Sequence, residues 1–195
     1  MKPVIVRPDL PAHGVAAPGV VTGNSYRLLY GINWMQKRGY QPPHDIRIGA
    51  MLETPSIAYA SDRFYREVDF ISVGGNDLLQ FFFAADRGNE LVRQRYDMLS
   101  SPFLSFLQMV VRRCRDADCP LSFCGEVAGR PVDALALASI GLRTLSMRPT
   151  SIGPVKAMFR EVDLSAASKV LQAALDEARP DIRNHLTEWL EQQGR

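Results

Sequence analysis

Apolar residues follow two alternating spacings along most of the chain. Four short apolar runs have the character of buried strands, and each precedes a segment whose apolar residues recur every three or four positions. Gly and Pro separate many of these segments. The pattern predicts strands over residues 46–53, 70–73, 121–124 and 142–147, and helices over 26–38, 56–67, from Ser101–Pro102, from Pro131 to Gly141, from Pro154, over 164–179 and over 180–193.

The repeated order of strand and helix predicts an α/β fold with a parallel sheet and right-handed crossovers. Two architectures fit this order, a β/α barrel and a doubly wound sheet, and both place ligands at the carboxyl ends of the strands. Residues 1–24 are rich in Pro and Gly and predict an irregular or poorly ordered N-terminal segment. Residues 25–195 are then the folded domain.

Polar side chains gather where the predicted strands end. Residues 69–87 read DFISVGGNDLLQFFFAADR, in which an apolar strand stops at a Gly pair and Asn76 and Asp77 follow at once. The preceding strand ends at Glu53. Two carboxylates on adjacent strand ends make a hard oxygen site suited to Mg²⁺, with water and a phosphate group completing the shell. The alternative to a metal site is purely structural. Glu53 would pair with an arginine, and Asp77 would cap a helix.

Three further side chains near these strand ends each have two interpretations. Asn76 can bridge ligand oxygens through its side-chain NH₂, or serve as a turn residue after Gly–Gly. Arg87 is a fixed cation suited to phosphate oxygens, or it pairs with Asp86 or Glu90 on the surface. Cys124 ends the predicted strand LSFC and can act as a general acid or base, although a lone Cys is more often a small buried hydrophobe.

Composition and charge exclude several classes of protein. The chain has 195 residues, of which 46% are hydrophobic and 23% charged, enough for one domain with a substantial core. Its net charge of +2 gives no argument for a nucleic-acid or membrane partner. No apolar run is long enough to span a bilayer, and the N-terminus has no apolar signal region. We therefore expect a cytoplasmic protein.

The remaining candidate ligands have no predicted role. An odd number of cysteines suggests a reducing compartment, and their even spacing lacks the CxxC pairs of a zinc site. None of the histidines has the small-residue setting expected of a phosphorylated histidine. A basic group on the helix that begins at Ser101 is interpreted as its water-facing side rather than a binding patch. The cysteines are Cys114, Cys119 and Cys124, and the histidines are His13, His44 and His185. The basic group consists of Arg112, Arg113 and Arg115.

The segment DFISVGGNDLLQFFFAADR closely resembles a signature of enzyme I, the phosphoenolpyruvate–protein phosphotransferase family of bacterial sugar and nitrogen phosphotransfer systems. Three further segments match the same family in order and spacing. The sequences SVGGND and SMRPTSIGPVK are most similar to the nitrogen-related branch. Gly75 departs from the family, which more often has Ser or Thr there. The further segments are LETP at 52–55, LSFCGEVAG at 121–129 and LSMRPTSIG at 145–153.

The resemblance implies a TIM-type (β/α)₈ barrel that binds phosphoenolpyruvate (PEP), and Mg²⁺-dependent transfer of its phosphoryl group to a protein histidine. Glu53 and Asp77 would ligate Mg²⁺, while Asn76, Asp77 and Arg87 would bind PEP. Cys124 would be the acid that protonates enolpyruvate as pyruvate forms. In the family, the phosphoryl group passes to a histidine on a separate N-terminal domain and then to a small HPr-like phosphocarrier protein.

The chain matches only the C-terminal half of such a barrel, about four βα units. The early strands, which carry further phosphate-binding arginines in the family, and the phosphohistidine domain have no match here. Half a barrel leaves two open sheet edges and one uncovered apolar face, so we expect the chain to form a homodimer. We also expect it to be inactive without the missing parts of the enzyme. The alternatives are a truncated, non-catalytic ligand-binding or interaction module, and a fragment of the similar barrel of pyruvate phosphate dikinase or PEP synthase.

Overall fold

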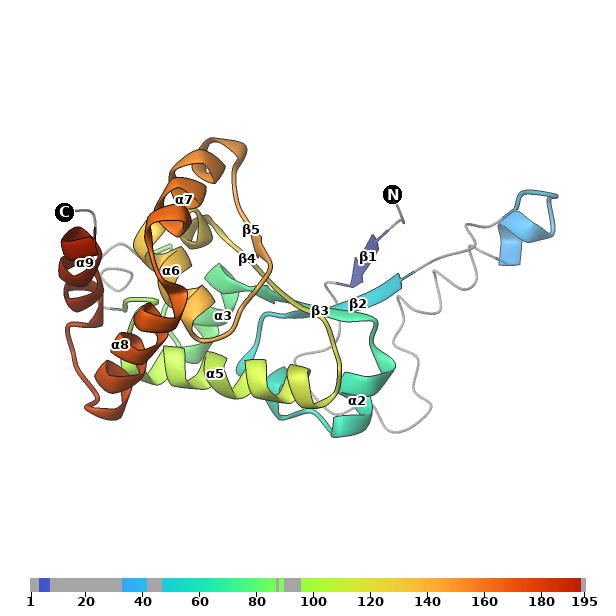
Figure 1. Cartoon of the computed structure of the whole chain (residues 1–195). Coiled ribbons are helices and arrows are strands. Elements are labelled where there is room, and N and C mark those ends of the chain that lie inside the picture. Colours follow the sequence, from blue (N-terminus) through green and yellow to red (C-terminus); the bar gives the residue numbers. More distant parts are fainter. Residues whose placement is uncertain (1–3, 8–32, 42–46, 87, 90–95, 194–195) are drawn as a thin grey trace.

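One parallel sheet organises the chain (Figure 1). The structure, a computed structural model, describes residues 4–7, 33–41, 47–86, 88–89 and 96–193. Five strands lie in the order β1-β2-β3-β4-β5, and each is parallel to its neighbour. Their bounds are β1 Val4–Arg7, β2 Arg47–Leu52, β3 Phe70–Gly74, β4 Leu121–Cys124 and β5 Leu145–Ser146.

From β2 onward, at least one helical segment follows every strand. Two of these segments are 3₁₀ helices, η1 and η2, and the others are α-helices. Their bounds are η1 Pro55–Tyr59, α2 Asp62–Glu67, α3 Gly75–Phe82, α5 Ser101–Asp116, η2 Glu126–Gly129, α6 Pro131–Ser139, α7 Pro149–Glu161, α8 Leu164–Asp176 and α9 Ile182–Gln193.

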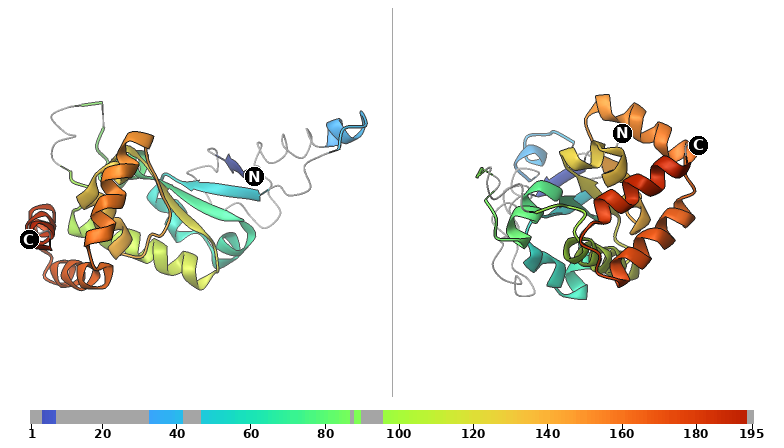
Figure 2. Two further views of the ribbon diagram at one scale, coloured as in Figure 1. Left: turned by 45° about the horizontal axis from the view of Figure 1, so that its top comes forward. Right: turned by 90° about the vertical axis from the view of Figure 1, so that its left-hand side faces the viewer.

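The strand order decides between the two architectures that the sequence left open. A doubly wound sheet reverses its strand order at a switch point, whereas a β/α barrel adds each strand beside the previous one. Here all neighbours in the sheet are consecutive in the chain. Helices α2 and α5 lie along one side of the sheet (Figures 1 and 2). The described residues therefore form an open segment of a β/α barrel, as predicted, with β1 as an additional strand.

The core lies between the sheet and helix α5. Ala50 and Leu52 of β2, Ile71 and Val73 of β3, and Phe123 of β4 are fully buried. Their spacing is the period of two that a strand requires when one face packs against helices. The apolar stripe that the sequence predicts on α5 belongs to the same core as these strand residues. All of its members are buried: Phe103, Phe106, Leu107, Val110 and Cys114.

The other face of the sheet carries small and polar side chains. By alternation it presents Met51, Ser72, Ser122 and Cys124, and the Ser72 Oγ–H donates to Cys124 Sγ at 3.6 Å. The sequence predicted an uncovered apolar face, and for these central strands that prediction was wrong. The reason is that this face corresponds to the inside of the barrel segment, opposite the face that packs against the helices.

β1 lies inside the N-terminal segment that the sequence predicts as irregular. It pairs with β2 from Val4 opposite Arg47 to Arg7 opposite Ala50. For these four residues the structure differs from the prediction, because pairing with a distant strand supplies hydrogen bonds that local composition does not reveal. Residues 8–24 lie outside the described residues.

Several element boundaries also differ from the prediction. The helix expected over 56–67 is two helices, because Ser61 Oγ accepts a hydrogen bond from the Phe64 N–H and caps a new one. α7 begins at Pro149, and Pro154 lies inside it. The strand expected over 142–147 is reduced to the short β5. Of the helix expected over 26–38, residues 33–36 are helical and residues 26–32 lie outside the described part of the chain.

Gly75 opens α3 directly against the ring of Phe123, and a Cβ at this position would lie inside contact distance of that ring. Replacing Gly75 with Ser, which the family more often has here, is therefore expected to lower the free energy of unfolding by about 1–3 kcal/mol through overpacking. Urea unfolding of wild type and Gly75→Ser measures this difference in the free energy of unfolding. Gly153→Ser is the matched control, since nothing lies within 4 Å of a Cβ there. Equal midpoints for Gly75→Ser and wild type would contradict the packing argument.

Candidate functional site

The register of the strands brings three sequence-predicted positions to one edge of the sheet. Leu52 pairs with Val73 and Gly74 pairs with Cys124, so the next residue of β2, Glu53, lies level with both. This edge is where the carboxyl ends of the strands meet, which is the functional edge of β/α barrels. Glu53 and Cys124 are therefore separated by one strand, at the position of Gly74.

Gly74 makes room for the Glu53 side chain. A Cβ on Gly74 would stand 2.6 Å from Glu53 Cγ and 3.1 Å from its Oε1. The Glu53 side chain therefore extends across the end of β3 rather than away from it. Glu53 is only partly buried.

Asn76 and Asp77 lie in the first turn of α3, immediately after β3 ends. The N-cap residue is Gly74, which provides no side-chain cap, so Asp77 is not the N-cap of this helix. Its carboxylate lies where the positive end of the helix dipole favours negative charge. Asn76 Oδ1 lies 3.6 Å from the place of a Cβ on Gly125, so the amide reaches toward the end of β4.

Cys124 occupies the end of β4 and faces the lumen. Its Sγ–H donates to the Val73 carbonyl at 3.2 Å, and Sγ accepts from Ser72 Oγ–H. Cys124 is half-buried, whereas Cys114 and Cys119 are buried. Cys124 at the strand end is thus the least buried of the three cysteines.

Arg87, the residue predicted to bind phosphate oxygens, lies outside the described residues, as does Glu90. The neighbouring Asp86 Oδ1 accepts a hydrogen bond from the Gly88 N–H at 2.8 Å.

Arg113 has a role that the sequence did not reveal. Its guanidinium donates to the Ala58 and Ala60 carbonyls and to Asp62 Oδ1, each at 2.7 Å. It also lies over the Tyr65 ring, with Cζ 4.8 Å from the centroid. The interpretation of Arg113 as part of a water-facing side was therefore wrong. By satisfying the carbonyls of η1, Arg113 fixes the segment that directly follows Glu53.

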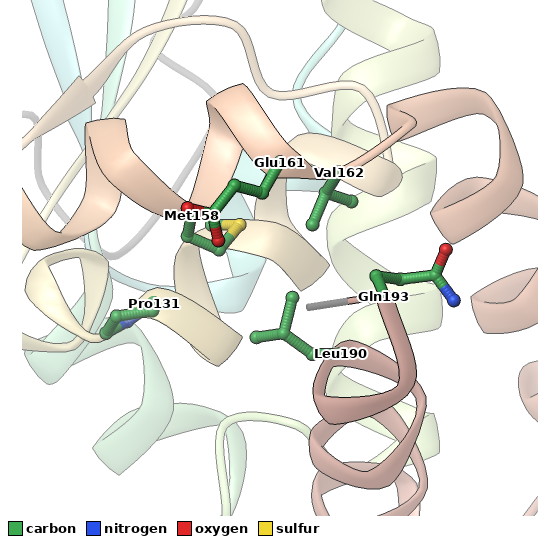
Figure 3. Close-up of a pocket in the computed structure, with 6 residues that line it drawn as sticks. All are labelled: Pro131, Met158, Glu161, Val162, Leu190 and Gln193. Carbon is green, nitrogen blue, oxygen red and sulfur yellow. The ribbon is translucent and has the colours of Figure 1, made fainter. Parts of the chain in front are cut away.

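A cavity of about 200 Å³ lies between α6, α7 and α9, away from the residues described above (Figure 3). The side chains of Met158, Val162 and Leu190 border it, and Glu161 and Gln193 lie at its margin. None of the sequence-predicted site residues contributes to its lining. It is a packing gap between helices rather than a candidate active site.

Residues 30–164 match the family described as "PEP-utilising enzyme, PEP-binding domain". The chain belongs to this family of PEP-utilising enzymes. A protein of Escherichia coli (strain K12) named "Phosphoenolpyruvate-dependent phosphotransferase system" is 36% identical over 157 residues, which cover 80% of this chain and 21% of that protein. A "Phosphoenolpyruvate-protein phosphotransferase" of Buchnera aphidicola is 37% identical over 131 residues, covering 67% of this chain and 23% of the relative.

A third relative, the "Phosphoenolpyruvate-protein phosphotransferase" of Priestia megaterium, is 38% identical over 128 residues. This match covers 66% of this chain and 22% of the relative. The chain thus spans about a fifth of the length of these curated relatives. Their names confirm the predicted resemblance to the phosphotransferase family, while the nitrogen-related branch stays a prediction.

Two further findings bear on metal and membrane binding. Within the described residues, no group of three or more His, Cys, Asp and Glu side chains is arranged to hold a metal ion. No helix in the same part of the chain is long and apolar enough to cross a membrane.

Proposed function

We propose that this chain provides the PEP-binding rim of a PEP–protein phosphotransferase. The observation that carries the proposal is the arrangement of Glu53, Asn76, Asp77 and Cys124 around the end of β3, in a chain of the PEP-utilising family. The chain gives two carboxylates, an amide and a thiol from three consecutive strand ends. The predicted position of Arg87, ten residues beyond Asp77, would add a cation.

Mg²⁺ fits this donor set. Glu53 and Asp77 offer hard oxygen ligands, and Mg²⁺ commonly takes only one or two carboxylates from a protein, with water and substrate phosphate completing its octahedron. The absence of a larger acidic cluster among the described residues is compatible with such a site. When bound, Mg²⁺ would neutralise charge that develops on the transferring phosphoryl group.

The remaining roles are those that the resemblance to the phosphotransferase family implies. The Asn76 amide and the Arg87 guanidinium would hold the phosphate and carboxylate oxygens of PEP. When the bond between phosphorus and the enol oxygen breaks, the enolate carbon needs a proton to form pyruvate. Cys124, whose thiol is fixed at the strand end by the Val73 carbonyl and Ser72, would supply it.

The phosphoryl acceptor is proposed to be a histidine on a separate N-terminal domain, as in the family, from which an HPr-like carrier would take the group. His185 lies on α9, and His13 and His44 lie outside the described residues. We also propose that the chain acts as a homodimer. Phosphoryl transfer requires its acceptor in a near-attack position, so the chain alone is expected to remain unlabelled on histidine after incubation with PEP and Mg²⁺.

Isothermal titration of PEP into the chain, with Mg²⁺ and separately with a chelator, tests the site. We expect heat of binding that saturates only when Mg²⁺ is present. Binding of equal affinity in the chelator would exclude a metal-dependent site, and the absence of binding under both conditions would show that this rim does not form a PEP site by itself. Histidine labelling in a parallel incubation would contradict the proposed acceptor.

A further inference from the structure

A second pocket lies at the opposite end of the sheet from the proposed PEP site. Its volume is about 550 Å³, and it is bordered by the C-terminal half of α5, the start of β4 and the segment between α6 and β5. Apolar residues and two buried cysteines border it together with three exposed arginines. The lining residues are Gln108, Val111, Arg112, Cys114, Arg115, Cys119, Leu121, Ile140, Gly141 and Arg143.

The end of α5 brings Cys114 and Cys119 together. The Cys119 N–H donates to the Cys114 carbonyl at 2.8 Å, and Asp118 between them has φ +52°. This is the Schellman arrangement, in which the residue after the left-handed position contacts the last helical turn. Because the bonds Cα–C, C=O and N–Cα add about 4.2 Å to that hydrogen bond, the two Cα atoms stand at most about 7.0 Å apart, the separation beyond which a disulfide cannot form without backbone movement.

The two thiols are chemically unequal. A hydrogen bond from the Cys114 thiol lowers the pKa of Cys119, against burial and the nearby carboxylates of Asp118 and Asp69. The same hydrogen bond, together with burial, raises the pKa of Cys114. Cys119 is therefore the more acidic of the two thiols. Only a thiolate attacks an oxidant efficiently, so the pair contains a nucleophile and a partner able to resolve the product.

We propose that Cys114 and Cys119 form a redox-modification site, which hydrogen peroxide entering the arginine-rimmed pocket converts to a disulfide. The Cys119 thiolate attacks one peroxide oxygen and the O–O bond breaks. Hydroxide departs, and Cys119 becomes a sulfenic acid. The Cys114 sulfur then attacks the Cys119 sulfur, the S–O bond breaks, and the thiol proton leaves with the departing oxygen as water. The two thiols are oxidised, and the peroxide is reduced to two molecules of water.

The test uses the purified chain without PEP or Mg²⁺, so its outcome is independent of the proposed phosphotransferase site. The chain is treated with hydrogen peroxide, remaining thiols are alkylated, and intact mass and tryptic peptides are measured. We expect loss of two hydrogens and a disulfide between Cys114 and Cys119, restored by dithiothreitol. Cys114 and Cys119 should be lost together, and Cys124 should remain open to alkylation.

Fragment spectra must locate the bond, because Cys119 and Cys124 share the tryptic peptide 116–143, in which Pro131 prevents cleavage after Arg130. In Cys114→Ala, the disulfide is expected to be lost and a sulfenic acid on Cys119 to become trappable with dimedone. Preferential oxidation of Cys124, a bond to Cys124 or to a second molecule, or alkylation of all three thiols after peroxide would each overturn the proposal. The wild-type peptide map decides the question even where a variant does not fold.

Discussion

Replacing Asp77 with alanine is expected to abolish Mg²⁺-dependent binding of PEP. Asp77 lies in the first turn of α3, directly after the end of β3, and is one of the two proposed Mg²⁺ ligands. Substitution of residues that merely orient a metal ligand typically costs 10–100-fold in metal affinity, so loss of a direct ligand is expected to reduce affinity about 100-fold or more. Titration calorimetry of PEP in the presence of Mg²⁺ measures this change.

Asp116→Ala is the matched control for Asp77→Ala. It makes the same change in charge and volume on an exposed side chain at the far end of α5. We expect its affinity for PEP to equal that of wild type. Glu53→Gln, which keeps the side-chain volume, should weaken binding as Asp77→Ala does. A full-affinity complex with either site variant, at unchanged Mg²⁺ dependence, would contradict the shared metal site.

Arg183→Ala is expected to cause a large loss of stability. Arg183 of α9 donates to both oxygens of Asp133, at 2.9 and 2.7 Å, and to both oxygens of Asp97 at 2.6 Å. Asp133 is fully buried, so removal of Arg183 leaves a buried carboxylate without its cation. Such a loss typically costs 3–5 kcal/mol, and we expect about 3 kcal/mol here because Arg183 itself is one-third exposed. Urea unfolding at neutral pH measures the difference.

Two further variants separate this buried charge from general damage. Arg63→Ala removes an exposed pair with Glu67 and should leave the unfolding midpoint unchanged. Adding Asp133→Ala to Arg183→Ala should recover part of the lost stability, since it removes the unpaired charge. A double variant less stable than Arg183→Ala would show that the main cost lies in packing rather than in the orphaned carboxylate.

The same cluster predicts how stability depends on pH. Burial acts to raise the pKa of Asp97, but hydrogen bonds from Arg183 and from the Leu99 N–H outweigh it and hold that pKa below its ordinary value. Asp97 therefore contributes stability above its unfolded pKa of about 3.9, and this contribution is lost as pH falls through the lower folded pKa. In Arg183→Ala this part of the acid dependence should become shallower.

Local sequence was sufficient where one element determines its own structure. The period of two in β2 separates Ala50 and Leu52 from Met51 without knowledge of any partner. The helical period of α5 likewise predicted the buried stripe from Phe103 to Cys114. Prediction failed where a distant residue acts: the pairing of β1 with β2, and the binding of η1 carbonyls by Arg113.

The sequence by itself determined the alternation of strands and helices, the family, and the residue types that end each strand. These properties depend on neighbours within a few positions, which fix periodicity and motif. Only the tertiary structure decided that Glu53 crosses the end of β3 over Gly74, that Cys124 is level with both, and that Arg183 neutralises Asp133. Such contacts depend on strand register and helix packing, and residues twenty or more positions apart set both.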